Sequence, residues 1–134
     1  MVTFLIAAET HLVQQLDKVT DCLFKDSEDV DWHCILAARE NHEALKEHID
    51  KLWPSRCLLT NDSQWSIGEI YVTDTLSESP QPNRSCIINT MPNLMIPTNS
   101  AKLIIEVITD NREAGRQKYR HYQQNGIPPH VEHL

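Results

Sequence analysis

The chain has 134 residues, enough for one domain with a hydrophobic core, and its 19 Asp and Glu against 12 Lys and Arg give a formal net charge of -7. That charge argues against non-specific binding to nucleic acid or anionic membranes, because phosphate groups attract positive surfaces. No apolar run approaches the roughly 20 residues that a membrane span requires. The opening segment lacks the basic region of a signal peptide, so we expect a soluble protein.

The first part of the chain alternates between expected strands and helices. Val2–Ala7 is a short apolar run that predicts the first strand. Thr10 is placed to cap a helix whose apolar residues follow helical spacing as far as Leu23. The polar, acidic segment 25–31 predicts a turn, and Trp32–Ala38 predicts a second buried strand.

Asn41 is the expected cap of a second helix, which Pro54 would close. The apolar face of that helix is expected to contain Leu45, His48, Ile49, Leu52 and Trp53. Alternation of strand and helix favours an α/β fold with a mostly parallel sheet flanked by helices, formed by a single domain over residues 1–134.

The middle of the chain is less regular. The segment 57–59 is short and ambiguous, whereas Glu69–Thr73 and Ser85–Thr90 predict strands. The segment 77–84 between them reads as a loop, and 91–100 is expected to be mostly loop because it contains two prolines.

The last part gives the clearest pattern. Ala101–Thr109 predicts the clearest strand of the chain, and Asp110 with Glu113 three residues later resembles a capping box at the start of a final helix. Gly126 is expected to end that helix, because two prolines follow it closely.

The sequence contains only three glycines, Gly68, Gly115 and Gly126. A dinucleotide fingerprint or a P-loop needs several glycines in one turn, so that backbone N–H groups can approach phosphates. We therefore expect an alternating fold without a nucleotide-binding loop, which argues against a nucleotide-dependent enzyme.

Metal and catalytic motifs are also missing from the sequence. The cysteines at 22, 34, 57 and 86 form no C-x-x-C pair and are expected to be reduced and buried. His130 and His133 have H-x-x-H spacing but lie where we expect the chain to fray. Asp62, Glu69 and Asp74 fit a solvated surface better than a nuclease cluster, and neither a zinc-protease nor a nucleophile-elbow motif occurs. The sequence predicts no metal, no cofactor and no enzymatic activity.

The final helix is basic although the protein is acidic, with four Arg and Lys against two acids between residues 110 and 126. At helical spacing one face carries Arg112, Arg116, Tyr119, Arg120 and Gln123. Gly115, Tyr122 and part of Tyr119 face the other way and suit packing on a sheet. Guanidinium groups beside an aromatic ring suit a carboxylate-rich peptide with an apolar anchor. A solvated basic face and a stripe for single-stranded nucleic acid are the alternatives.

Several segments, in order along nearly the whole chain, resemble one known family. They are "VTFLI", "HCILAARENHEALKEHIDKLW", "SCIINT" and "KLIIEVITDNREAGRQKYRHYQQNGI", of which the last and the Leu52-Trp53 helix end are the most specific. The chain is similar to the chi subunit of bacterial DNA polymerase III. The resemblance implies a Rossmann-like three-layer sandwich and a non-enzymatic, cytoplasmic accessory subunit of the clamp-loader complex at replication forks.

The resemblance also implies two partners and their surfaces. Chi proteins capture the acidic tail of single-stranded DNA-binding protein, which ends in Pro-Phe. On this chain Arg112, Arg116 and Arg120 would meet its carboxylates, and Tyr119 would line the pocket for its terminal ring. Chi proteins also pair with the psi subunit, and some bind a helicase. A small module that binds single-stranded DNA directly through the same helix is the alternative function.

The surface for psi is expected near Trp53, Leu58 and Leu59. Relatives often carry an aromatic residue followed closely by Pro-His after this helix, whereas this chain reads "CLLTND". The departure suggests a divergent psi subunit or another partner, and Trp53 as a core residue at a helix end is the alternative.

Overall fold

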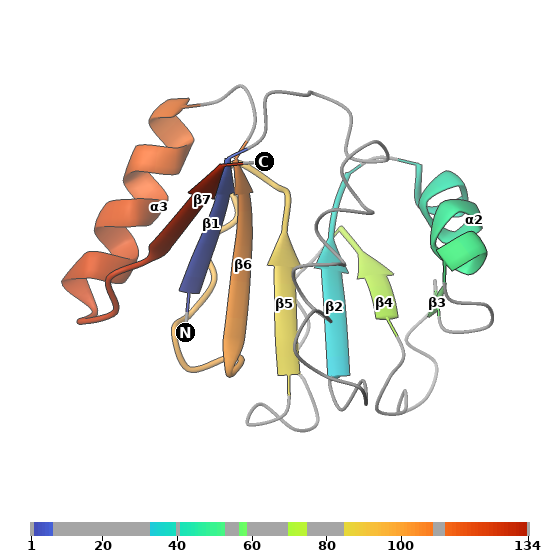
Figure 1. The fold of residues 1–134 in the computed structure, drawn as a ribbon, viewed down its shortest axis with the longest axis horizontal. Coiled ribbons are helices and arrows are strands. Elements are labelled where there is room, and N and C mark those ends of the chain that lie inside the picture. The colour runs from blue at the N-terminus through green and yellow to red at the C-terminus, as the bar shows by residue number, and fades with distance from the viewer. Residues whose placement is uncertain are drawn as a thin grey trace.

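The computed structural model describes residues 2–6, 33–39, 41–52, 57–58, 70–74, 85–108 and 112–133. These residues contain seven strands and two helices (Figure 1). They are β1 (Val2–Ile6), β2 (His33–Ala37), α2 (His42–Leu52), β3 (Cys57–Leu58), β4 (Ile70–Thr73), β5 (Ser85–Asn89), β6 (Leu103–Ile108), α3 (Arg112–Gln124) and β7 (His130–His133).

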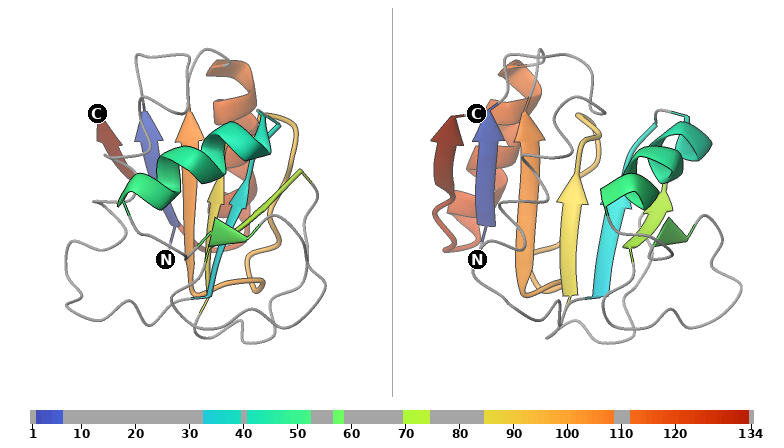
Figure 2. Two further views of the ribbon diagram at one scale, coloured as in Figure 1. Left: turned by 90° about the vertical axis from the view of Figure 1, so that its right-hand side faces the viewer. Right: turned by 45° about the vertical axis from the view of Figure 1, so that its right-hand side comes forward.

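The strands form one seven-stranded sheet in the order β3-β4-β2-β5-β6-β1-β7, and every pair of neighbours is parallel. Helices α2 and α3 lie on opposite faces of this sheet (Figure 2). The predicted α/β class is therefore confirmed as a Rossmann-like sandwich whose described strand pairings are all parallel.

The inner strands are buried on both faces, as expected for a parallel sheet covered by helices. All described residues of β4 and β5 are buried, and β6 is buried except at Leu103. Two apolar clusters result, because successive side chains in a strand point to opposite faces. One lies on the side of α2 and includes Leu36, Leu45 and Ile88, and the other lies on the side of α3 and includes Phe4 and Ile104.

Helix α2 forms as its sequence predicts. The side-chain oxygen of Asn41 accepts hydrogen bonds from the backbone N–H groups of Glu43 and Ala44, at 3.0 and 3.3 Å. These bonds satisfy groups that the first turn of a helix leaves without partners. Leu45 and Ile49 are fully buried against the sheet. Of the predicted apolar face, His48 is half-buried, and the side chains of Leu52 and Trp53 lie outside the described residues.

The segment 90–102 is a loop, as its prolines predict, and it covers the same face as α3. Its Ile96 is fully buried in the cluster beside that helix. Asn89 fixes the start of the loop, because its side chain accepts from the N–H of Met91 at 3.0 Å and donates to the carbonyl of Leu94 at 2.8 Å. The loop therefore covers part of the sheet next to α3.

The expectation of a frayed segment around His130 and His133 is wrong. Gly126 ends α3 with φ of 77°, a left-handed conformation that glycine adopts without steric cost. The chain then turns back, and β7 pairs in parallel with β1. All four residues of β7 are exposed, so the strand lacks the alternation of apolar and polar residues that identifies a strand in a sequence.

Other predicted features lie outside the described residues. They are the helix capped by Thr10, the turn at 25–31, Pro54, the loop at 77–84 and the capping residue Asp110. Neither described helix is long and apolar enough to cross a membrane.

Candidate peptide-binding site

Helix α3 has a buried face and an exposed face. Ala114, Gly115, Lys118 and Tyr122 are buried. Gly115 allows close contact with the sheet, because a Cβ atom at this position would lie only 3.0 Å from Cγ2 of Ile108 in β6. The small and aromatic residues predicted to face the sheet therefore do so.

The exposed face carries the predicted arginines. Arg112, Arg116 and Arg120 are all exposed and follow one another at intervals of one helical turn. Nη1 of Arg116 lies 3.7 Å from a carboxylate oxygen of Glu113, a loose contact between side chains that are 68% and 63% exposed. Arg112 and Arg120 form no ion pair within the described residues. Among the described residues, Arg112 and Arg120 are thus without an ionic partner, and Arg116 has only a loose one.

Tyr119 lies at the border between the two faces. Its ring is half-buried and meets the ring of Phe4 edge-on, with centroids 5.7 Å apart and an interplanar angle of 88°. With about 3.6 residues per turn, Arg112 and Arg116 lie beside Tyr119 on the side of α3 nearest β1. His121 lies on the other side, where its ring contacts the carbonyl of Ile96 at 3.0 Å. The structure brings the four predicted residues onto one helix, with the ring anchored in the core.

Lys118 differs from the arginines because its side chain is only 1% exposed. Its ammonium group donates to the backbone carbonyl of Met91 at 2.7 Å and to Oε1 of Glu106 at 3.2 Å. Tyr122 donates its hydroxyl proton to the other carboxylate oxygen of Glu106 at 2.8 Å. We call Glu106, Lys118 and Tyr122 the buried triad. Their bonds join α3 to β6 and to the loop after β5.

Burial sets the pKa of each member of the buried triad. It raises the pKa of Glu106, although the charge of Lys118 and the hydrogen bond from Tyr122 act in the opposite direction. It lowers the pKa of Lys118, which Glu106 in turn raises. Burial, followed by the charge of Glu106, raises the pKa of Tyr122 above its ordinary value. The charges of Glu106 and Lys118 compensate each other inside the protein, so Lys118 is not a contact for a ligand.

Sequence reasoning counted Lys118 among the basic residues of the helix and did not predict this network. Two signals were present in the sequence. Glu106 interrupts an otherwise apolar strand, and Lys118 falls between Gly115 and Tyr122 on the helix face that packs on the sheet. A buried acid is expected to have a partner of opposite charge.

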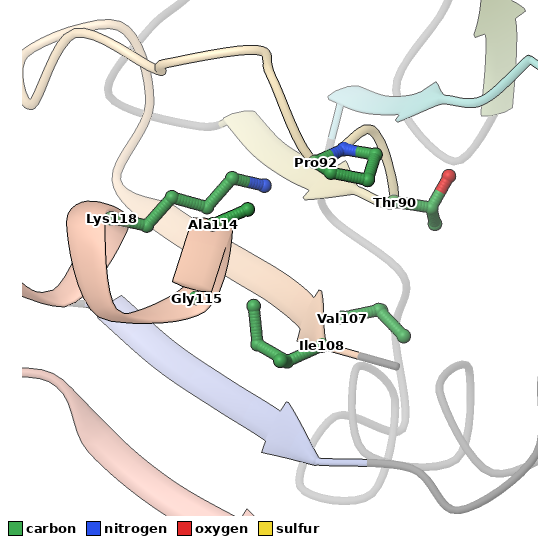
Figure 3. A pocket seen from close by; sticks show the side chains of 7 residues that line it. All are labelled: Thr90, Pro92, Val107, Ile108, Ala114, Gly115 and Lys118. Atoms are coloured by element: carbon green, nitrogen blue, oxygen red, sulfur yellow. The ribbon is translucent and has the colours of Figure 1, made fainter. Parts of the chain in front are cut away.

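A small hollow lies beside the buried triad, at the carboxyl ends of β5 and β6 (Figure 3). Its lining consists of Thr90, Pro92, Val107, Ile108, Ala114, Gly115 and Lys118. Its volume of about 10 Å³ is close to the space for one water molecule. The hollow is too small for an aromatic side chain, so it is not the pocket predicted beside Tyr119.

The structure describes only some of the residues that were predicted for other sites. Trp53 and Leu59 lie outside the described residues, and Leu58 belongs to β3, the edge strand opposite β7, without a described side chain. Asp74 follows β4 and is exposed. The described part of the chain contains no group of three or more His, Cys, Asp or Glu side chains that is arranged to hold a metal ion.

Cys34 and Cys86 are buried free thiols that are partners in register on β2 and β5. Burial is the main cause that raises the pKa of the Cys86 thiol well above its ordinary value, and Cys34 adds to it. These two cysteines are therefore the reduced, buried residues that the sequence predicts.

Comparisons with family models, with curated proteins and with solved structures found no match for this chain.

Proposed function

We propose that this protein is a non-catalytic, cytoplasmic adaptor of DNA replication that binds an acidic peptide tail through α3. The observation that carries the proposal is the row of exposed arginines, Arg112, Arg116 and Arg120, beside the half-buried ring of Tyr119. Arginine forks pair with carboxylates in a bidentate manner, and the ring offers an apolar surface to a hydrophobic residue. The peptide would be the tail of single-stranded DNA-binding protein, in line with the resemblance to chi subunits.

The charge distribution supports a protein ligand over a nucleic acid. The whole chain carries a formal charge of -7, so the basic row is a local feature of an acidic molecule. An acidic body repels the phosphates that flank a binding site on a long strand, whereas a short peptide contacts the basic row alone.

A second partner, the psi subunit, would connect the protein to the clamp loader. Its proposed surface includes Leu58, which belongs to the edge strand β3, together with Trp53 and Leu59. This edge is opposite the edge beside α3, so the two partners would bind without competing. A helicase is the alternative partner for this surface.

The test is a titration with a fluorescent acidic peptide that ends in Pro-Phe, at low and moderate salt. We expect saturable binding, and a loss of about tenfold or more in Arg116→Ala, because hydrogen bonds to charged groups contribute about 1.5–3 kcal/mol. Arg39→Ala is the matched control, since Arg39 is an exposed arginine that follows β2 and lies outside α3. Its affinity should equal that of the wild-type protein.

Two results would contradict the proposal. One is the absence of peptide binding by a folded wild-type protein. The other is equal weakening by Arg116→Ala and Arg39→Ala, which would show a non-specific charge effect. A parallel titration with a bare single-stranded oligonucleotide tests the alternative function. Tight binding to the oligonucleotide would favour direct contact of α3 with DNA.

A further inference from the structure

Strand β7 forms the edge of the sheet next to the peptide-binding helix. It pairs with β1 on its inner side, and within the described residues no strand pairs with its outer side. The right-hand view of Figure 2 shows α3 behind β1 and β6, with β7 beyond β1. An edge strand presents backbone N–H and C=O groups without partners, which are a template for another extended chain.

The side of β7 that faces α3 continues the apolar surface of Tyr119. Val131 is the register partner of Phe4, whose ring meets Tyr119, so Val131 lies on the face of the sheet that α3 covers. Val131 is also 39% exposed, and among the large apolar side chains that the structure describes only Met95 is more exposed. Tyr119 and Val131 are therefore both neighbours of Phe4 on this face, and helical spacing places Arg112 and Arg116 on the side of α3 nearest β1.

The opposite face of β7 has a different character. Glu132 and His130 are register partners of Leu5 and Thr3, and they contact each other at 3.2 Å on the face away from α3. An acidic side chain on that face would meet the carboxylate of Glu132, whereas on the α3 face it would meet arginines. The two faces thus favour acids at alternate positions of an added strand.

We propose that the acidic peptide binds as an eighth strand along the outer edge of β7, with alternate acidic side chains directed at Arg112 and Arg116. This inference rests on the proposed function and specifies how the peptide is held. Charge complementarity selects the occupant, because this edge of the sheet presents Val131 and Tyr119 on the same side as Arg112 and Arg116. Backbone hydrogen bonds to β7 add affinity that is independent of the peptide's side chains.

Backbone methylation of the peptide tests the proposal without changing the protein. The parent acidic peptide is compared with two versions that carry N-methyl groups on alternate amides. One version is methylated at the odd-numbered amides of the peptide and the other at the even-numbered amides. An added strand directs every second N–H toward its neighbour, so one version should lose about tenfold or more in affinity, from two lost hydrogen bonds. The version in the other phase is the matched control and should bind nearly as the parent peptide does.

Each outcome distinguishes the two proposals. If both methylated versions bind as the parent peptide does while Arg116→Ala still weakens binding about tenfold or more, the peptide lies on α3 without pairing to β7. That result overturns the strand addition and leaves the adaptor function intact. If the parent peptide does not bind, both proposals fail. If one phase alone weakens binding, amide exchange should also slow in the complex at alternate residues of β7, those whose N–H groups face away from β1.

Discussion

Helices α2 and α3 both pack on the same sheet but are fixed to it in different ways. Helix α2 buries Leu45 and Ile49, two aliphatic side chains, and its exposed side carries charges of both signs, including the pair Lys46–Asp50 at 2.6 Å. Helix α3 buries Lys118 and Tyr122 in hydrogen bonds. Its exposed face carries arginines.

The difference shows how a binding face is held in position. Apolar contacts are not directional, so a helix like α2 can rotate slightly at small cost. The buried triad is directional, because any rotation of α3 would separate Lys118 and Tyr122 from Glu106 and leave a buried charge without a partner. The polar inner face therefore fixes the direction in which Arg112 and Arg116 point.

The largest expected effect comes from removing one charge of the buried triad. Lys118→Met should lower the free energy of unfolding by about 3–5 kcal/mol, because Glu106 would remain buried without its partner. Denaturant unfolding followed by circular dichroism measures this loss. The double variant Lys118→Met with Glu106→Gln is the control and should recover a large part of the stability. A double variant no more stable than Lys118→Met would show that Lys118 acts through packing alone.

A smaller effect is expected at Tyr122. Tyr122→Phe removes a hydrogen bond to a carboxylate and should cost about 1.5–3 kcal/mol near neutral pH. The folded protein keeps the phenol protonated because its pKa is raised, whereas the unfolded chain loses that proton near pH 10. Unfolded molecules thus bind fewer protons above about pH 10, and the free energy of unfolding falls as pH rises.

The stability advantage of the wild-type protein over Tyr122→Phe should therefore shrink above about pH 10. Unfolding curves for both proteins, measured at neutral pH and at about pH 11, test this sign. An advantage that stays constant or grows with pH would contradict the raised pKa of Tyr122.

The smallest expected effect on stability is at Arg116, two residues from Lys118 but on the exposed face. Its contact with Glu113 is loose and solvent-exposed, so Arg116→Ala should change the free energy of unfolding by less than about 0.5 kcal/mol. The same variant should lose peptide binding. A loss of stability similar to that of Lys118→Met would mean that the two faces of α3 are not distinct.

The sequence predicts the strands and helices of the core well, because hydrophobic periodicity and capping residues are features of each segment alone. Asn41 and Gly126 mark the start of α2 and the end of α3 where the structure has them. The burial of Lys118 was not predicted because it depends on Glu106, which is distant in sequence. Strand β7 was missed because its formation depends on β1 and not on its own residues. Both errors concern contacts between distant segments, which local patterns do not encode.

The position of β1 between β6 and β7 has a consequence for the order in which the protein assembles. Of the described strands β1 comes first in the chain, yet Val2 pairs with Ile104 and Thr3 with His130. Its neighbours in the sheet are both synthesised in the last third of the chain, so it waits without partners while the rest emerges at about 5–20 residues per second. Closing such long loops slows folding. Among the described strands, the one synthesised first is therefore among the last to be paired, and its pairing completes the sheet beside the arginine row.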